Sequence, residues 1–460
     1  MMKQKRRVHR KLSGVFMIGL ALIAFISCTT STLPVTPETA LQNYLQTEDQ
    51  SFAWELSGSQ DINGLTAHTL ILTSQKWREH IWKHTLTILV PEEMSHDGAL
   101  LFITGGKNKE GNPIKRGGDD EFIMTMAQVA KKNSAMVAII WQIPNQPLYD
   151  DLTEDALISF TLHNYKNDGD FTWPLLFPMV KTAVKAMDAV QEFSKETIQH
   201  DIDRFVVTGA SKRGWTTWLT GANDPRVEAI APMVIDVLNM PVSLDYQVHV
   251  WKEYSIQIED YTELGIPQDV HTENGDDITT MVDPYSYREK LTMPKMIFIG
   301  TNDEYWPVDA IKHYYDEIPG ENYIHYVPNA GHGLGDGQQA LTALSAFFGN
   351  TLLHEKYPLC NWEIAENESL ITLSVETTPD KLLGAMLWSS DSEDRDFRDE
   401  VWSSGDVEYL DPENFEVEVD IPESGYRAFY LDLRYSDPMG GAYTKSTRMF
   451  VTDGTGVLEN

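Results

Sequence analysis

The sequence predicts an α/β fold built on a mostly parallel sheet, and three observations lead to this class. Short apolar runs typical of buried strands alternate with helical segments up to about residue 357. At residues 206–215 (VVTGASKRGW) an apolar strand stops at a small residue, presents Ser211 and restarts as a helix. After about residue 358 the apolar period changes from helical to alternating. The turn at Ser211 is typical of a nucleophile elbow, the strained turn that exposes a serine hydroxyl in α/β-hydrolases.

The N-terminus is typical of an export signal. Basic residues precede an apolar run at residues 14–26, which is shorter than the roughly 20 apolar residues of a membrane span. Residues 25–28 (FISC) resemble a bacterial lipobox, with Phe25 where Leu is usual. We therefore expect a lipoprotein-type signal peptide over residues 1–28, lipidation of Cys28 and a flexible tether over residues 29–38. The protein would be exported and anchored to a membrane of the cell envelope; plain cleavage and secretion is the alternative.

The composition excludes several classes of function. Without the six basic residues that precede Cys28, 30 Lys and Arg stand against 69 Asp and Glu, and such a charge repels nucleic acid. Cys28 and Cys360 are the two cysteines, too few for a disulfide framework or a multi-cysteine zinc site. The sequence shows no glycine-rich phosphate loop and no paired histidines. We therefore expect no nucleic-acid partner, no metal and no cofactor.

The elements of the sheet follow in order along the chain. Strands are predicted at residues 85–90, 99–104, 136–141, 205–207, 229–235 and 295–300, and helices at 121–131, from Pro178 onward and at 338–353. Residues 237–291 interrupt the alternation with many aromatic and acidic side chains, which predicts a cap inserted into the hydrolase domain of residues 39–357. The alternation at residues 371–375, 415–419 and 429–433 predicts a small, antiparallel, β-sandwich-like domain over residues 358–460.

A serine hydroxyl needs a base, and the base needs an orienting acid. Asp303 follows the strand at 295–300, and His332 stands between two glycines 29 residues later. The order Ser211, Asp303, His332 is that of an α/β-hydrolase triad, so we predict a nucleophile, an acid and a base. Asp236 is the alternative acid because it also ends an apolar strand, and Glu304 is a weaker candidate.

The oxyanion that forms on the substrate needs N–H donors. The backbone of Lys212, directly after the nucleophile, is predicted to give one, and Gly105 and Gly106 lie in the loop where the second is expected. The Lys212 ammonium either assists the oxyanion or is solvated at the helix start. Arg213 occupies the usual position of the second elbow glycine, so its side chain crowds the turn unless it swings out to solvent.

Several blocks resemble the PhoPQ-activated pathogenicity-related protein family over about residues 38–355. They are residues 73–77, 144–147, 173–181, 186–190, 208–215, 223–227 and 234–239. The resemblance implies an α/β-hydrolase-like protein that is secreted or membrane-associated. The elbow is also similar to that of glucuronoyl esterases, in which the basic residue after the serine is thought to assist the oxyanion; this similarity implies such a role for Lys212.

These observations together predict an envelope-anchored serine hydrolase that cleaves an ester or amide bond in a small-molecule, peptide or saccharide substrate. Two alternatives stay open: a catalytically inactive signalling or binding protein on the same scaffold, and a glucuronoyl-esterase-like carbohydrate esterase whose C-terminal β domain contacts polysaccharide. Within the enzyme class, Glu154 and Asp155 are candidates to hold the amine of a peptide substrate, although we expect them to be solvated acids in a loop-like segment.

Overall fold

The computed structural model describes residues 34–367 and 369–459. The predicted signal peptide and Cys28 lie outside these residues, as do residues 29–33 of the predicted tether. The tether prediction extends too far, because helix α1 (Pro37–Gln46) already begins at a proline that suits a first helical turn. Within the described ranges, none of the helices combines the length and the apolar character needed to cross a membrane.

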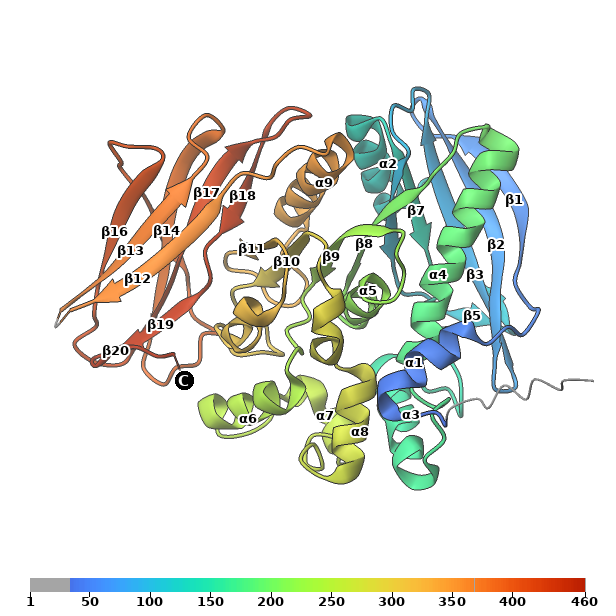
Figure 1. Cartoon of the computed structure of the whole chain (residues 1–460), viewed down its shortest axis with the longest axis horizontal. Helices are drawn as coiled ribbons and strands as arrows, with labels where there is room; N and C mark the ends of the chain where they lie inside the picture. Colours follow the sequence, from blue (N-terminus) through green and yellow to red (C-terminus); the bar gives the residue numbers. More distant parts are fainter. Residues whose placement is uncertain (1–33, 368, 460) are drawn as a thin grey trace, which may run out of the picture. The chain divides into compact units, whose positions relative to one another are not determined.

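A large sheet forms the centre of the fold (Figure 1). Its first nine strands lie in the order β1 (Ala53–Asp61), β2 (Leu65–Trp77), β3 (His80–Pro91), β7 (Met136–Ile140), β4 (Gly98–Ile103), β8 (Arg204–Ala210), β9 (Val227–Met233), β10 (Lys295–Gly300) and β11 (Asn322–Val327). The strands from β1 to β3 pair antiparallel, as β3 does with β7, and the strands from β7 to β11 run parallel. The predicted mostly parallel sheet is confirmed for these strands.

Strand β4 marks the point at which the strand order reverses. Leu100 of β4 pairs with Val137 of β7 on one side and with Val206 of β8 on the other. The chain passes from β4 to β7 on one side and then crosses to β8 on the other side. Ligands bind at the carboxyl ends of parallel strands beside such a reversal. The segment after β4 forms a short hairpin, β5 (Asn108–Lys109) with β6 (Asn112–Pro113).

Helices cover both faces of the sheet because alternate strand residues point to opposite sides. Leu101 of β4 packs with α4 (Leu176–Phe193) and α5 (Lys212–Gly221), whereas Leu100 packs with α2 (Glu121–Asn133) and α9 (Gln338–Leu353). The helix predicted to open at Pro178 begins two residues earlier, and the π-turn η1 (Ser194–Ile198) follows it.

Between β9 and β10 the chain forms helical elements in place of strands. They are α6 (Met240–Trp251), η2 (Ile256–Ile258), α7 (Glu259–Thr262), α8 (Glu273–Val282) and η3 (Pro284–Lys290). They lie beyond the ends of the strands, together with α3 (Glu154–Asp168), in the lower part of Figure 1. The short turns η4 (Ala310–His313) and η5 (Tyr315–Glu317) connect β10 to β11. This segment contains the residues predicted to form a cap.

The C-terminal strands form two facing sheets. The first contains β18 (Ala442–Ser446), β17 (Tyr426–Ser436), β14 (Leu382–Ser392) and β15 (Ser403–Asp406), with β19 (Phe450–Asp453) and β20 (Gly456–Val457); the second contains β12 (Cys360–Glu366), β13 (Leu370–Thr377) and β16 (Asn414–Asp420). Leu373 and Leu431 share one core between the sheets. Because Ser446 of β18 pairs with Ile324 of β11, the first sheet continues the central sheet across the predicted boundary at residue 358.

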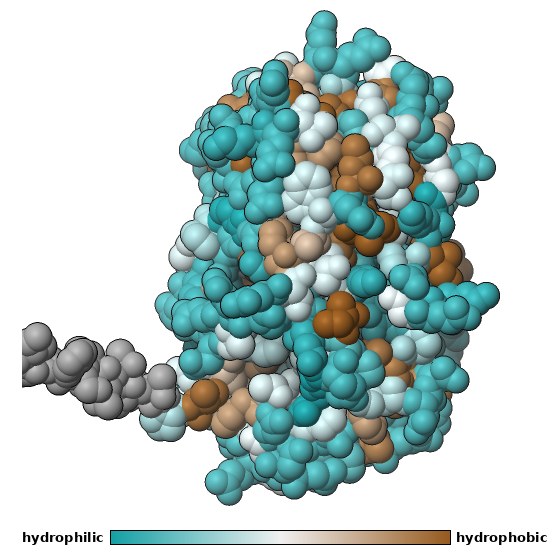
Figure 2. Space-filling model, turned by 90° about the vertical axis from the view of Figure 1, so that its right-hand side faces the viewer, coloured by the Kyte–Doolittle hydropathy of each residue, from teal (hydrophilic) through white to brown (hydrophobic). Residues whose placement is uncertain are grey.

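The opposite edge of the sheet is solvent-facing. Nearly every residue of β1 is exposed, and its register shifts between Leu56 and Gly58. Figure 2 views the molecule from this side, and hydrophobic side chains appear there as separate spots among hydrophilic ones. A bulged, polar edge strand resists pairing with other chains.

Candidate active site

Ser211 occupies a strained turn between β8 and α5. Its backbone has φ 57° and ψ −126°, a region that costs a non-glycine residue free energy and is found mostly at functional sites. The turn is held by two backbone hydrogen bonds, from Ser211 N to Met233 O (2.8 Å) and from Trp215 N to Ser211 O (2.9 Å). A Cβ atom on Gly214 would lie 2.7 Å from Ile235 Cγ2, which explains why the second glycine stands three positions after the serine.

Arg213 points inward and does not swing out to solvent, since 11% of its side chain is exposed. Its Nη1 and Nη2 donate to Glu154 Oε2 (2.7 Å) and Oε1 (2.8 Å), and its Nε donates to Ile143 O. A Cβ atom on Gly105 would lie 2.6 Å from Arg213 Nη2. The guanidinium therefore fits between the elbow and the loop after β4, and Gly105 leaves room for it.

Glu154 and Asp155 begin helix α3, so the expectation of solvated acids in a loop is wrong. Asp155 Oδ2 lies 2.8 Å from Lys212 Nζ, and Asp155 Oδ1 accepts a hydrogen bond from Tyr261 Oη (2.9 Å). Burial raises the pKa of Glu154, but the bonded guanidinium of Arg213 outweighs burial and lowers this pKa to about 2. Two cations and two carboxylates thus neutralise one another beside the nucleophile.

Lys212 is buried, with 10% of its side chain exposed, and this excludes the solvated role considered for it. Its ammonium is paired with Asp155 and lies 3.7 Å from Glu154 Oε2. Its backbone N–H stands at the first position of α5, where helical N–H groups lack partners within the helix.

His332 lies in the loop after β11 and is oriented by two acids. Its Nδ1 is 3.0 Å from Asp303 Oδ2 and 3.1 Å from Oδ1, so Nδ1–H donates to the carboxylate and Nε2 is left as an acceptor. Its backbone N donates to Glu304 Oε2 (3.0 Å), and the Tyr305 ring stacks on the imidazole at 4.0 Å between centroids. Among the described residues, none hydrogen-bonds to the buried Nε2.

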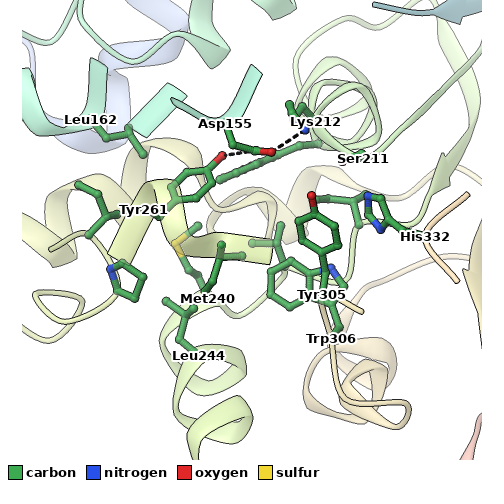
Figure 3. Close-up of a pocket in the computed structure, with 16 residues that line it drawn as sticks. Asp155, Leu162, Ser211, Lys212, Met240, Leu244, Tyr261, Tyr305, Trp306 and His332 are labelled. Atoms are coloured by element: carbon green, nitrogen blue, oxygen red, sulfur yellow. Dashed lines mark hydrogen bonds and ion pairs between the residues drawn. The ribbon is translucent and has the colours of Figure 1, made fainter. Parts of the chain in front are cut away.

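Ser211 and His332 line the same pocket (Figure 3). Lys212 and Asp155 line it as well. Gly105 and Gly106 do not contribute to its lining: Gly105 faces Arg213, and Gly106, with φ +148°, faces Gln142. The structure thus brings together the predicted nucleophile, base and acid at the carboxyl ends of β8, β10 and β11, with the glycine loop packed behind the elbow.

Asp236 lies three residues after the end of β9 and does not hydrogen-bond to His332. It is 3% exposed, and its Oδ1 has no partner among the described residues. Burial raises the pKa of Asp236 to about 7, and the charges of Asp303 and Asp309 act in the same direction. The imidazole is therefore oriented by Asp303, and Asp236 stands apart as a buried carboxyl.

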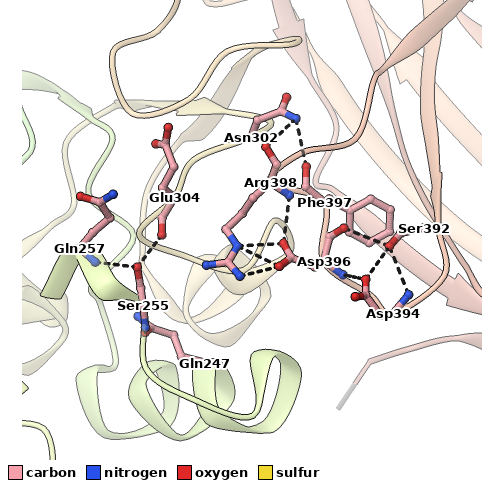
Figure 4. A network of polar contacts seen from close by, with 10 residues as sticks. All are labelled: Gln247, Ser255, Gln257, Asn302, Glu304, Ser392, Asp394, Asp396, Phe397 and Arg398. Atoms are coloured by element: carbon pink, nitrogen blue, oxygen red, sulfur yellow. Dashed lines mark hydrogen bonds and ion pairs between the residues drawn. The ribbon is translucent and has the colours of Figure 1, made fainter. Parts of the chain in front are cut away.

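Sequence reasoning missed the contact between the site and the C-terminal segment (Figure 4). Asn302 Nδ2, next to Asp303, donates to the carbonyls of Phe397 (3.0 Å) and Glu400 (2.8 Å). Asn329 exchanges two hydrogen bonds with the backbone of Trp402 (2.8 and 3.0 Å). We call residues 397–402 the strap. No local pattern marks asparagines whose partners lie 73 to 98 residues further along the chain.

The reversal in strand order, the elbow and the acid and histidine after the following strands define an α/β-hydrolase fold. The chain belongs to the PhoPQ-activated pathogenicity-related protein family, whose model matches residues 41–398. It is 30% identical over 431 residues to autocrine proliferation repressor protein A of Dictyostelium discoideum, and 86% of each chain is covered.

Solved structures with some likeness to this chain include two esterases. Acetyl xylan esterase 1 from Thermoanaerobacterium sp. matches 70% of this chain and 95% of its own, with 16% identity and a TM-score of 0.49. The glucuronoyl esterase from Solibacter usitatus matches 69% of this chain and 92% of its own, with 12% identity and a TM-score of 0.39.

Proposed function

We propose that this protein is a serine hydrolase that cleaves an ester or amide bond through Ser211, His332 and Asp303. One observation carries the proposal. The imidazole of His332 is fixed by Asp303 with its Nε2 unpaired among the described residues, and it lines the same pocket as a serine held in a strained elbow. A base poised in this way is what a serine nucleophile requires.

In the proposed reaction His332 Nε2 accepts the proton of Ser211 Oγ as this oxygen attacks the substrate carbonyl carbon. The Lys212 N–H stabilises the oxyanion. The tetrahedral intermediate collapses when His332 passes the proton to the leaving group. Water then attacks the acyl-enzyme with His332 as the base, and this step releases the acid and restores Ser211. Asp303 stabilises the imidazolium in both halves.

A fluorophosphonate probe tests this proposal because it phosphonylates an activated serine. We expect the wild-type protein to be labelled and to hydrolyse p-nitrophenyl esters. The Ser211→Ala variant should lose both activities, with turnover falling at least about a thousandfold. Ser404→Ala, on the exposed strand β15, is the matched control and should retain both. Labelling that persists in Ser211→Ala would remove this serine from its role.

We further propose export and a lipid anchor at Cys28, on the basis of the sequence of residues 1–28. In a bacterial host the wild-type chain should incorporate labelled palmitate and sediment with membranes. Cys28→Ser should lose the label and move to the soluble fraction. Incorporation of palmitate by the Cys28→Ser variant would contradict the proposal.

A further inference from the structure

The pocket beside Ser211 has one polar end and otherwise apolar walls. Figure 3 shows Asp155, Lys212 and Ser211 on one side and Met240 and Leu244 on the opposite side. The apolar walls come from the cap, from α3, from the start of α5, from the segment after β9 and from the loop after β10: Leu162, Trp215, Ile235, Val237, Met240, Leu244, Ile258, Ile266, Pro267 and Trp306. A substrate group that enters from Ser211 therefore meets hydrocarbon.

The polar end offers no net charge to a substrate. Asp155 is the one acidic residue among those that line the pocket, and its carboxylate is already paired with Lys212 and bonded to Tyr261. The neighbouring Glu154 is held by Arg213. A substrate ammonium would have to displace Lys212, and a substrate carboxylate would have to displace Asp155, each leaving a buried charge unpaired at high cost. This arrangement favours an uncharged group.

The size of the pocket limits the length of that group. The cavity has a volume of about 60 Å³. Met240 and Leu244 lie opposite Ser211 and limit how far a substrate group extends.

We propose, resting on the hydrolase function argued above, that this cavity is the acyl pocket for an uncharged, aliphatic acyl group of short to medium length. The cap residues Met240 and Leu244 set the length of the acyl chain. The pocket thereby assigns the substrate class as esters of short to medium fatty acids, in preference to aminoacyl or uronoyl substrates.

The test uses p-nitrophenyl esters from acetate to dodecanoate on the wild-type protein. Each buried methylene contributes about 0.8 kcal/mol, so kcat/KM should rise about fourfold per methylene among the short esters, reach an optimum and fall for the longest esters. An aminoacyl p-nitroanilide should be a much poorer substrate than the hexanoate ester. A flat chain-length profile, or a preference for the aminoacyl substrate, would overturn the assignment.

Variants of one cap residue sharpen the test. Leu244→Trp fills the cavity and should lower kcat/KM for hexanoate more than tenfold while acetate changes less than threefold. Leu244→Ala enlarges the cavity and should move the optimum to longer esters, and it carries the test if the tryptophan variant does not fold. Val248→Trp is the matched control, because Val248 lies on the same helix but is 38% exposed. An unchanged length profile in both Leu244 variants would overturn the proposal.

A second readout separates this proposal from the hydrolase function. Alkylboronic acids form a tetrahedral adduct with an active serine, so they protect it from the fluorophosphonate probe without any turnover. Butyl to hexyl boronates should protect Ser211 better than methyl or dodecyl boronates. Labelling of Ser211 that all chain lengths protect equally would overturn the acyl pocket alone, whereas labelling elsewhere in the protein would overturn the hydrolase function itself.

Discussion

Asp303 and Asp236 are both buried carboxylates that follow the ends of neighbouring strands, but only Asp303 contacts the imidazole. Replacing Asp303 with Asn reverses the donor and acceptor pattern that fixes the histidine tautomer. We expect Asp303→Asn to lower kcat by about a thousandfold or more, with a small change in KM. Asp236→Asn should stay within about threefold of the wild type, since its carboxyl makes no bond to His332. Steady-state kinetics on one ester decide between them, and the opposite ranking would make Asp236 the working acid.

The buried carboxyl of Asp236 also sets a pH dependence of stability. Its pKa is about 7 in the folded protein, raised first by burial, against 3.8 as the ordinary value. Between these pH values the folded state binds more protons than the unfolded state, so the free energy of unfolding falls as pH rises from about 4 to 7 and then levels off. Asp236→Asn removes this loss. We therefore expect the Tm of the variant minus the Tm of the wild type to be a few degrees larger at pH 8 than at pH 4.

Thermal unfolding followed by circular dichroism at the two pH values measures this difference. Comparing the variant with the wild type at each pH cancels any effect of the substitution that does not depend on pH. A Tm difference that is equal at pH 4 and pH 8, or larger at pH 4, would contradict a buried carboxyl that titrates near neutrality.

The strap connects two loops that carry the proposed acid and base. Asn302 N donates to Ala330 O (2.9 Å), so the two loops also touch directly. Loss of the Asn302 amide would leave the carbonyls of Phe397 and Glu400 without their partner. We expect Asn302→Ala to lower kcat about tenfold or more with KM little changed, because small misplacements of catalytic groups are costly.

Kinetics and denaturant unfolding together distinguish positioning from stability. Each carbonyl left unpaired costs about 1 to 3 kcal/mol, so some destabilisation accompanies the loss of kcat. Asn361 on β12 is exposed, and its amide is bonded to Glu376 on the neighbouring strand β13. The control Asn361→Ala removes this bond and should leave kcat unchanged. If Asn302→Ala lost stability with an unchanged kcat, the strap would have no role in positioning the site.

Local sequence patterns predicted the elements that depend on neighbouring residues. The strands at 99–104 and 229–235 and the helix at 338–353 were recognisable because apolar spacing follows their own geometry. The paired state of Glu154 and Asp155 at the start of α3 was missed. Their partners, Arg213 and Lys212, lie nearly 60 residues further along the chain, and nothing in the local sequence indicates them. Long-range charge pairing leaves no periodic trace in the sequence.

The same reasoning explains which parts of the site could be predicted. Ser211, Asp303 and His332 each follow the carboxyl end of a strand of one parallel sheet, and that topology places all three at the same edge. The apolar pocket was not predictable, since much of its wall comes from the cap, whose packing the apolar pattern does not specify. The strap was hidden for the same reason, since its contacts depend on where the C-terminal strands dock.

The C-terminal strands extend the central sheet of the hydrolase fold. They pair with the edge of the central sheet at β11, and Arg395 lies 3.4 Å from the buried Asp309. Val35–Asn460 form one compact unit. Removal of residues 358–460 would expose the β11 edge and the apolar side chains that pack against these strands, and unpaired sheet edges promote aggregation. We therefore expect the chain truncated after residue 357 to be insoluble or to lack a cooperative unfolding transition.

Calorimetry of the complete chain tests the same point without a truncation. A sheet shared between the two segments couples their unfolding, so the heat capacity trace should show one transition, and Asn302→Ala should shift that transition as a whole. Ester hydrolysis should be lost over the same temperature range. Two separated transitions, or a soluble and active fragment of residues 39–357, would mean that the C-terminal strands form an independent domain and that the strap is dispensable for the site.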